Sequence, residues 1–370
     1  VQGYLANRGV ATILYDRIKP NPESEAVDDG AAVARDKKVD FVVGLGGGST
    51  IDAAKSIALM ARNAGSYWDY MRAGSGGGKT PEAPALPLVA LPTTAGTGTE
   101  VTPWAVITRS GSSEKRAWRN ESTFPHLAIV DPELIHTLPS RIIAYTGMGV
   151  FFNAVGAILA TSRQPHSDML ALEAIQIISR FLPPAVKGGA DQNVRTMLSW
   201  ASTAAGMGMS ISSGISHHTL AHALSALAPH LPQGIGLTLS SEAYFSWLGG
   251  RRSERFDLLA DAMGLNLADE TADGRHRFRA ALRHLIQSVG LADESLANYG
   301  LGIDDIPTLA SHVSETMEAL FDVAPVLQDR SDIEAILADA LQDSRKGTNT
   351  GKVNGSTAKT DPQRRSLHGA

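Results

Sequence analysis

Three consecutive glycines, Gly46, Gly47 and Gly48, separate two apolar runs in "VVGLGGGSTIDAAKSIA" (42–58). The run before them is typical of a buried strand, and the lysine-bearing run after them is typical of a helix. Unpaired backbone N–H groups and the helix dipole favour an anion at such a strand-to-helix turn. The turn therefore predicts a bound phosphate, and hence a nucleotide. The alternative is that the glycines only form a tight turn.

The elements that must position this turn alternate between strands and helices. We predict strands at 10–16, 39–46, 86–94 and 126–134, and helices at 23–37 and 49–62. This alternation indicates a parallel sheet with helices on its faces. After Pro139, long apolar runs at helical spacing predict a mostly helical region. We expect an α/β domain at 1–138, a helical domain at 139–343, and a disordered polar tail at 344–370.

Composition narrows the class of protein. The 370 residues are 43% hydrophobic and 19% charged with a formal net charge of -5, so we expect no nucleic-acid partner. The chain has no cysteine, which excludes disulfides, thiolate zinc sites and a cysteine nucleophile. We expect no apolar run of the about 20 residues needed to span a bilayer, and no signal peptide. We therefore predict a cytoplasmic enzyme with no membrane partner.

Two motifs carry a family resemblance. The run 46–55, "GGGSTIDAAK", resembles the GGGSxxDxAK signature of the iron-containing (group III) alcohol dehydrogenases, and 92–101, "PTTAGTGTEV", resembles their second signature. The run 128–148, "AIVDPELIHTLPSRIIAYTGM", is similar to the segment that joins the two domains of that family. The resemblance covers about residues 10–240. It implies a dehydroquinate synthase-like fold, with an N-terminal dinucleotide-binding α/β domain and an all-α C-terminal domain.

The resemblance also implies an activity. Such an enzyme transfers a hydride reversibly between an alcohol and an aldehyde or ketone, holds NAD or NADP between its two domains, and forms a homo-oligomer. The three glycines would let the backbone approach the pyrophosphate, and Ser49 would cap the helix and donate to it. Hydroxyl groups for phosphate, ribose or carboxamide would come from Thr93, Thr94 and Thr97.

Three further residues have two interpretations each. Asp52 and Lys55 lie one turn apart, so they orient the nicotinamide end or pair with each other. Lys115 corresponds to a lysine that the family places near the cofactor, and the alternative is a solvated surface lysine.

The metal-ligand pattern of the family is largely replaced. The family holds iron or zinc through one aspartate and three histidines, and the metal acts as a Lewis acid. Where the pattern is TGMDxxxHA, this chain has "TGMGVFFNA", with Gly149 and Asn153 at the ligand positions. His218 keeps its position, whereas Gln233 replaces the last histidine. Because first-row metals need about three protein ligands, we expect no catalytic metal.

Other histidines offer a substitute site. His218 and His222 are spaced i and i+4, as on zinc-binding helices, and His217 and His230 are near them in sequence. The alternative is that these are core or cleft histidines satisfied by hydrogen bonds. A carboxylate from elsewhere in the chain could complete the substitute metal site.

The chain also starts roughly 50 residues later than the family does, a difference of about one βα unit and an entry strand. We expect this difference to leave an open sheet edge and an incomplete adenosine pocket. Three explanations are open: the chain is a fragment, a partner subunit covers the gap, or nucleotide binding is weakened.

Two functions remain open on these observations. The first is an oxidoreductase that works without metal, as the similar maleylacetate reductases do, with His222 as proton relay and His218 beside it. The second is a degenerate, inactive family member that binds nucleotide or acts as a partner subunit.

Overall fold

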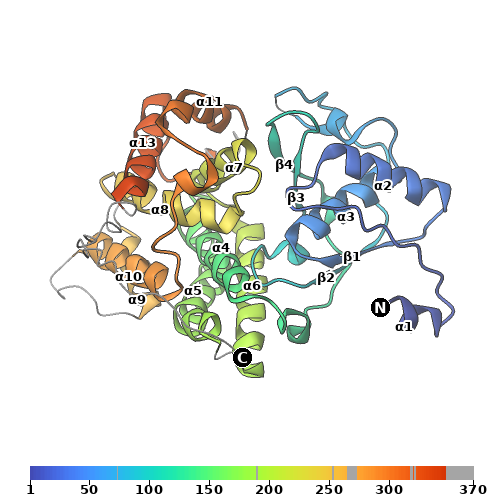
Figure 1. The fold of residues 1–370 in the computed structure, drawn as a ribbon. Coiled ribbons are helices and arrows are strands. Elements are labelled where there is room, and N and C mark those ends of the chain that lie inside the picture. The colour runs from blue at the N-terminus through green and yellow to red at the C-terminus, as the bar shows by residue number, and fades with distance from the viewer. Residues whose placement is uncertain are drawn as a thin grey trace, which may run out of the picture.

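Two regions lie side by side in the computed structural model, as Figure 1 shows. The structure describes residues 1–72, 74–188, 191–251, 254–264, 273–316, 320 and 322–346. The first part of the chain forms an α/β region and the rest forms a helical region, which confirms the predicted fold class. Of the predicted tail, 347–370 lie outside the described residues.

The α/β region is built on a parallel sheet. Its elements are α1 (Gln2–Ala6), α2 (Ser24–Asp36), β1 (Val42–Gly46), α3 (Gly48–Met60), η1 (Tyr67–Tyr70), β2 (Leu88–Pro92), η2 (Thr99–Val101), β3 (Trp104–Thr108), β4 (Lys115–Arg119), η3 (Glu121–Thr123), β5 (Leu127–Ala128) and η4 (Pro132–Ile135). The sheet order is β1-β2-β5, with parallel pairing throughout. A Cβ on Gly44 would lie 3.0 Å from the Cβ of Ala54, so this glycine lets α3 pack closely on the sheet.

Most of the predicted elements of this region are present. The predicted strands at 39–46, 86–94 and 126–134 appear in shorter form as β1, β2 and β5, and the predicted helices at 23–37 and 49–62 are α2 and α3. Because β1 ends at Gly46 and α3 begins at Gly48, the glycine turn lies at the carboxyl end of a parallel strand. That edge is where open α/β sheets bind their ligands.

The strand predicted at 10–16 is wrong. The segment is extended, but it pairs with no described strand, and Ile13 and Leu14 are 47% and 66% exposed. A side chain anchors it instead, since the hydroxyl of Tyr15 donates to Asp29 on α2 at 3.0 Å. β-branched residues favour an extended backbone, but only a neighbouring strand turns that backbone into a sheet.

An antiparallel hairpin of β3 and β4 was not expected from the sequence. Trp104 pairs with Arg119 and Thr108 with Lys115. The connection contains Gly111 at φ +71°, which a glycine adopts without steric cost. The hairpin is important for the site because β4 carries Lys115 into the interior.

The helical region surrounds a large apolar core. Its elements are α4 (Ser140–Leu159), α5 (Pro165–Val186), α6 (Gln192–Ser212), α7 (Ser216–Leu227), α8 (Gln233–Gly249), α9 (Phe256–Met263), α10 (Gly274–Ser288), η5 (Leu296–Tyr299), η6 (Ile303–Asp305), α11 (Ile306–Thr316) and α13 (Arg330–Lys346). Helix α4 packs against α5, α6 and α8. Its side chains Val150, Phe151 and Val155 are fully buried in that core.

One expectation about membrane spans needs correction. Helices α4 and α5 are long and apolar enough to cross a membrane by length and composition, although the sequence was expected to hold no such run. Most of the apolar window of α4 is buried inside the protein. A helix enclosed on all sides by others is apolar all round for that reason alone.

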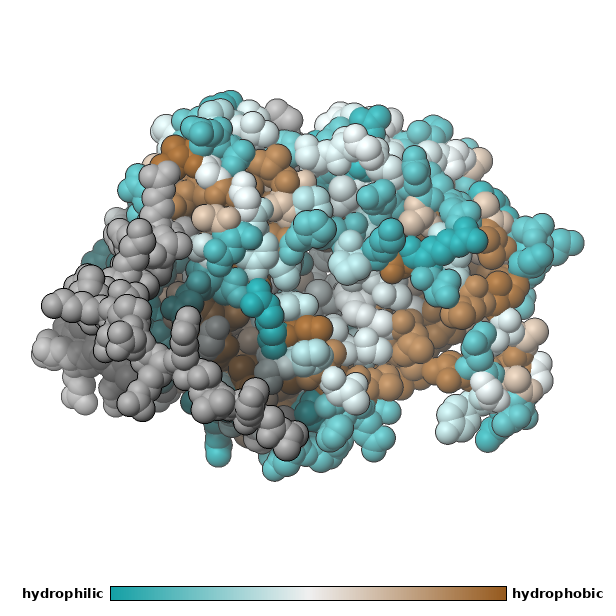
Figure 2. All heavy atoms as spheres, in the orientation of Figure 1, coloured by the Kyte–Doolittle hydropathy of each residue, from teal (hydrophilic) through white to brown (hydrophobic). Residues whose placement is uncertain are grey.

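One face of the parallel sheet carries exposed apolar side chains. Leu45 on β1 and Leu127 on β5 are 42% and 52% exposed, and Ile129 just beyond β5 is 43% exposed. Figure 2 shows a hydrophobic area on this side of the α/β region, next to α1. Parallel sheets usually have both faces covered, so this face is an exception.

Candidate active site

The glycine turn presents free backbone donors at the start of α3. Gly47 is the N-cap and the helix begins at Gly48. Ser49 therefore lies inside the first turn, so the prediction that Ser49 caps the helix is wrong, because the helix starts one residue earlier than expected. The first N–H groups of a helix have no intrahelical partner, which leaves those of Gly48 and Ser49 available to an anion.

The predicted threonines lie beside this turn: Thr93, Thr94 and Thr97. The N–H of Thr93 donates to the carbonyl of Gly46 at 2.9 Å. A Cβ on Gly48 would lie 2.5 Å from the Cγ2 of Thr97, so a larger residue at 48 would displace the threonine segment. The structure thus joins the two motifs into one surface of backbone donors and hydroxyl groups.

Asp52 and Lys55 do not pair directly with each other. Both bind Thr99, whose hydroxyl donates to Asp52 Oδ1 at 2.6 Å and accepts from Lys55 Nζ at 2.6 Å. Asp52 Oδ2 also accepts from the N–H of Val106 at 3.0 Å, and Lys55 Nζ donates to the carbonyl of Trp104 at 2.7 Å. Burial raises the pKa of Asp52 and lowers the pKa of Lys55 to about 8. These contacts tie α3 to β3.

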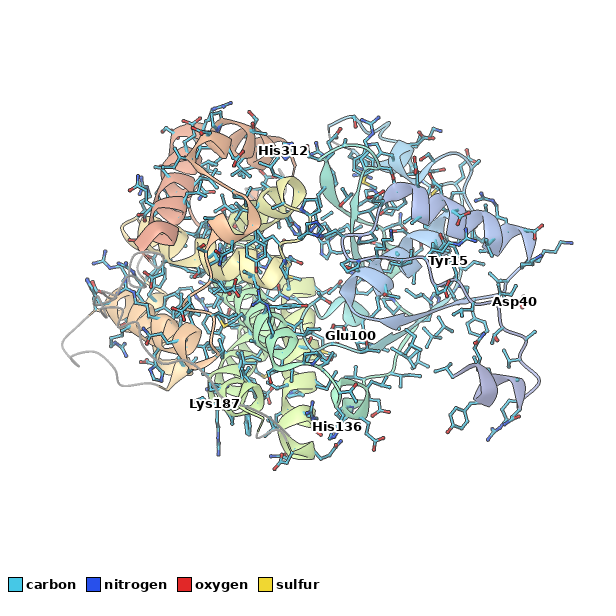
Figure 3. The ribbon with its side chains drawn as sticks, in the orientation of Figure 1. Tyr15, Asp40, Glu100, His136, Lys187 and His312 are labelled. Atoms are coloured by element: carbon cyan, nitrogen blue, oxygen red, sulfur yellow. The ribbon has the colours of Figure 1, made fainter. Side chains whose placement is uncertain are left out.

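Glu100 and Gly98 dock the threonine segment onto α6. Glu100 is buried, and its Oε1 accepts from the hydroxyl of Thr203 at 2.8 Å. Burial raises the pKa of this carboxyl. Gly98 has φ +62°, and a Cβ there would lie 2.6 Å from the Cα of Gly206. Figure 3 labels Glu100 where the α/β and helical regions meet.

Lys115 is buried, so the alternative of a solvated surface lysine is wrong. Its Nζ donates to Asn21 Oδ1 at 2.7 Å and to Ser225 Oγ on α7 at 2.9 Å. The amide of Asn21 donates in turn to the carbonyl of Pro229 at 2.8 Å. Burial lowers the pKa of Lys115 to about 8. Lys115 therefore joins the α/β region to α7.

Asn153 links the threonine segment to His218. Its Nδ2 donates to the carbonyls of Gly96 and Thr97, both at 3.3 Å, so its Oδ1 faces the imidazole. His218 Nε2 lies 2.8 Å from that oxygen and is therefore assigned the proton. Burial lowers the pKa of His218 to about 4, which keeps the ring neutral. At Gly149, one turn before Asn153, a Cβ would have the Gly96 carbonyl oxygen nearest, at 3.5 Å.

His222 lies beside Gln233. The Nε2 atoms of the two side chains are 3.4 Å apart, so the amide donates to the ring. The Nδ1 of His222 is buried and has no partner in the part of the chain that the structure describes. Burial, with a smaller effect from the nearby charge of Lys115, lowers the pKa of His222 well below its usual range.

The other two histidines lie in different environments. His217 Nε2 contacts the carbonyl of Leu237 at 3.0 Å, and its ring stacks on Tyr244 with centroids 4.9 Å apart. His230 is exposed. Within the described ranges, no group of three histidine or acidic side chains could hold one metal ion. His217 therefore fits the interpretation of a hydrogen-bonded core histidine.

Sequence reasoning assigned no role to several residues of this site. Glu100 is the only acidic residue in the run 92–101, which is a signal that could have drawn attention to it. Asn21 and Ser225 gave no signal, because they are about 200 residues apart in sequence and meet only through Lys115.

A glycine turn at a helix start lies beside a hydroxyl-rich loop, and Asn153 joins that loop to the neutral imidazole of His218. This arrangement is the one expected of a nucleotide-dependent dehydrogenase. Residues 1–132 match the family described as "Iron-containing alcohol dehydrogenase", and residues 143–341 match its C-terminal family. The chain belongs to this family and is an alcohol dehydrogenase.

Individual proteins of this family are similar to the chain over most of its length. The NAD-dependent methanol dehydrogenase of Bacillus methanolicus is 31% identical over 90% of this chain and 85% of that protein. The 1,3-propanediol dehydrogenase of Klebsiella pneumoniae is 32% identical over 83% of this chain and 78% of that protein. The solved structure of an archaeal alcohol dehydrogenase from a Red Sea brine pool has a TM-score of 0.86 at 32% identity, and covers 92% of this chain and 87% of its own.

Proposed function

We propose that this alcohol dehydrogenase interconverts an alcohol and an aldehyde or ketone with NAD or NADP, and that it does so without a catalytic metal. The hydrogen bond of 2.8 Å between Asn153 and His218 carries the proposal. Asn153 and His218 stand at two of the positions where the family holds its metal. Their hydrogen bond engages Nε2 of His218, which is the one family ligand that this chain keeps.

The residues at the four positions do not fit a divalent metal. Gly149 has no side chain, Asn153 is engaged on both amide atoms, and Gln233 donates to His222. A metal of this kind needs about three ligands from imidazole, carboxylate or thiolate. Only His218 supplies one of these groups, so no step of the reaction is assigned to a metal.

The residues at the glycine turn do fit a dinucleotide. The N–H groups of Gly48 and Ser49 suit the pyrophosphate, and the hydroxyl groups of Thr93, Thr94 and Thr97 suit its oxygens or the ribose. The nicotinamide ring would supply the hydride donor and acceptor. Asp52 bonds to Thr99 and Val106, and Lys115 bonds to Asn21 and Ser225, so both residues fix the segments around the proposed site. A direct contact of Asp52 or Lys115 with the cofactor remains a prediction.

His222 is the group proposed to handle the proton. Its ring is neutral because burial lowers its pKa, and its unpartnered Nδ1 can bind the substrate oxygen. Because Nε2 accepts from Gln233, the neutral ring carries its proton on Nδ1. In carbonyl reduction this N–H gives its proton to the substrate oxygen while Nε2 takes up a proton from water, and alcohol oxidation runs the same two transfers in reverse. His218, held by Asn153, positions the helix turn on which His222 lies.

Small primary alcohols are the first substrates to test, since two relatives are named for methanol and 1,3-propanediol. We also propose a cytoplasmic homo-oligomer whose domains divide at 138/139. Light scattering would measure the oligomer mass, and limited proteolysis would locate the domain boundary.

The experiment measures metal content and turnover in one preparation. We expect protein purified without chelator to contain no stoichiometric iron or zinc, to bind NADH or NADPH by fluorescence, and to reduce short aldehydes at a rate that chelator does not change. One tightly held metal per chain would contradict the proposal. Nucleotide binding without turnover of any aldehyde would favour the inactive alternative.

A variant that restores the family ligands sharpens this test. Gly149→Asp/Asn153→His/Gln233→His would add three ligands to His218, and the space at Gly149 accepts a Cβ. We expect this variant to bind Zn²⁺ at least tenfold tighter than the wild-type chain, since it supplies a complete ligand set where the wild type has one. Equal zinc affinity of the two proteins would mean that the wild type holds metal by other residues.

A further inference from the structure

Ser225 connects the buried lysine of β4 to the main chain of the residue proposed to handle the proton. It lies on α7 and is 2% exposed. Its Oγ accepts from Lys115 Nζ at 2.9 Å and donates to the carbonyl of His222 at 3.1 Å. One hydroxyl group therefore holds both the ammonium group from the α/β region and the helix turn that carries His222.

The hydrogen bond inside α7 is ordinary for a helix serine, whereas the bond to Lys115 comes from another part of the fold. Serines in helices often donate to a carbonyl one turn earlier, as Ser241 on α8 does to Thr238 at 2.7 Å. In the part of the chain that the structure describes, the hydroxyl of Ser241 bonds only within its own helix. Ser225 also accepts from a cation, and hydrogen bonds to charged groups are stronger than those between neutral groups.

A second contact holds the corner that follows α7. Asn21 Oδ1 accepts from Lys115 Nζ at 2.7 Å, and its Nδ2 donates to the carbonyl of Pro229 at 2.8 Å. Pro229 lies between α7 and α8, and the first residue of α8 is Gln233, whose Nε2 is 3.4 Å from the Nε2 of His222. The lysine therefore reaches the surroundings of His222 along two routes, and the route through the serine of α7 ends on the main chain of His222.

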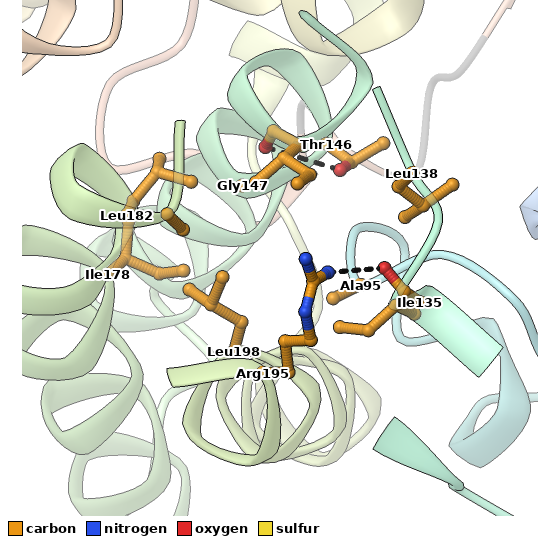
Figure 4. A pocket seen from close by; sticks show the side chains of 11 residues that line it. Ala95, Ile135, Leu138, Thr146, Gly147, Ile178, Leu182, Arg195 and Leu198 are labelled. Atoms are coloured by element: carbon orange, nitrogen blue, oxygen red, sulfur yellow. Dashed lines mark hydrogen bonds between the residues drawn. The ribbon is translucent and has the colours of Figure 1, made fainter. Parts of the chain in front are cut away.

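The α/β and helical regions are also joined away from α7. Nη1 of Arg195 on α6 donates to the carbonyl of Ile135 on η4 at 2.6 Å, as Figure 4 shows. Glu100 accepts from Thr203 on α6 at 2.8 Å. Because these contacts do not involve α7, removing the hydroxyl of Ser225 leaves the two regions attached. The expected effect is therefore on the position of α7 rather than on the fold.

We propose that Ser225 is a positioning residue that holds the imidazole of His222 at the substrate oxygen. The inference rests on the proposed function, because it needs the role of His222 in proton transfer. Misplacing a catalytic group by roughly 1 Å costs up to about 100-fold in rate, since the reacting atoms must be closely aligned. In this scheme Ser225 contacts neither substrate nor cofactor, so it acts through His222.

A double-mutant cycle on turnover separates positioning from a structural role. We expect Ser225→Ala to lower kcat for aldehyde reduction about tenfold in the wild-type background, and to leave the dissociation constant of NADH within about twofold. In the His222→Asn background the same substitution should lower kcat no further, because no imidazole is left to position. Equal losses of kcat in the two backgrounds would overturn the inference.

Ser241→Ala is the matched control, because it removes a buried hydroxyl that makes the same bond within a helix but has no lysine on it. We expect it to leave kcat unchanged. If Ser225→Ala fails to fold, Ser225→Cys keeps the size of the side chain, and its thiol is only a weak donor and acceptor. It should also lose turnover only where His222 is present, and an unchanged kcat in this folded variant would overturn the inference.

NMR of protein labelled with ¹⁵N-histidine tests the contact without turnover. We expect the ring nitrogen resonances of His222, assigned with His222→Asn, to shift in Ser225→Ala and to stay in place in Ser241→Ala. Full turnover in His222→Asn would contradict the proposed function and this inference with it, whereas equal losses in the two backgrounds contradict this inference alone. If the wild-type chain turns over no aldehyde, the resonances decide, and unshifted ones overturn the inference.

Discussion

At the scale of single residues, two amides stand where the family resemblance places metal ligands. Asn153 and Gln233 each contact a histidine of α7, at 2.8 Å and 3.4 Å. An amide can satisfy an imidazole nitrogen and carbonyl groups at once, whereas a carboxylate there would need a cation. The two substitutions therefore suit a buried site whose histidines stay neutral.

We predict that His222→Asn lowers turnover about 100-fold or more, the usual contribution of a general acid or base. NADH affinity should stay within about twofold of the wild type, because the nucleotide turn lies on other elements. Steady-state kinetics and fluorescence titration measure the two effects. His230→Asn, which changes an exposed histidine, is the control and should leave both unchanged. Full activity in His222→Asn would remove this residue from the mechanism.

At the scale of elements, the loop 92–101 is held from both sides. It packs on the start of α3 through Thr97 and on α6 through Gly98 and Glu100. Close approach of two backbones explains the glycine at 98, since any side chain there would overlap Gly206. The proposed nucleotide site therefore depends on a helix of the other region.

Gly98→Ala should destabilise the protein and weaken NADH binding, because the new Cβ would lie 2.6 Å from the Cα of Gly206. The matched control is Gly111→Ala, where φ is +71° against +62° but no atom lies within 4 Å of the new Cβ. Both variants share the strain of positive φ, roughly 1 kcal/mol. The extra loss in Gly98→Ala, measured by urea unfolding, then reports the contact with α6. Equal losses in the two variants would show that this contact contributes nothing.

At the scale of the whole molecule, a few polar contacts join the two regions. Lys115 on β4 reaches Ser225 on α7, and Asn21 reaches the carbonyl of Pro229. These contacts fix α7, and with it His222, relative to the sheet. The alignment of the proposed cofactor and proton sites therefore depends on a lysine whose charge is buried.

The pH dependence of stability tests this buried lysine. Folding lowers the pKa of Lys115 from 10.5 to about 8, so between these values the unfolded chain binds a proton that the folded chain does not. Stability from this group therefore rises with pH across that window, by about 1.4 kcal/mol per pH unit. We expect Lys115→Met to reduce the slope of the unfolding free energy between pH 8.5 and 9.5 by roughly that amount.

Lys55→Met is the control, because the pKa of Lys55 is also lowered to about 8 although it contacts only the α/β region. Each single variant should reduce the slope of the unfolding free energy by the contribution of one proton, about 1.4 kcal/mol per pH unit. An unchanged slope in Lys115→Met would mean that this amine is not buried in solution.

The sequence by itself determined the class of fold, the glycine turn and the identity of the residues at the positions where the family resemblance places metal ligands. These are local properties, since glycine runs, apolar periodicity and residue type are readable along the chain. Only the tertiary structure decided that residues 10–16 remain unpaired, that Lys115 is buried, and that Asn153 meets His218. Each of these depends on a partner far away in sequence, and burial or pairing is a property of two segments that neither one carries alone.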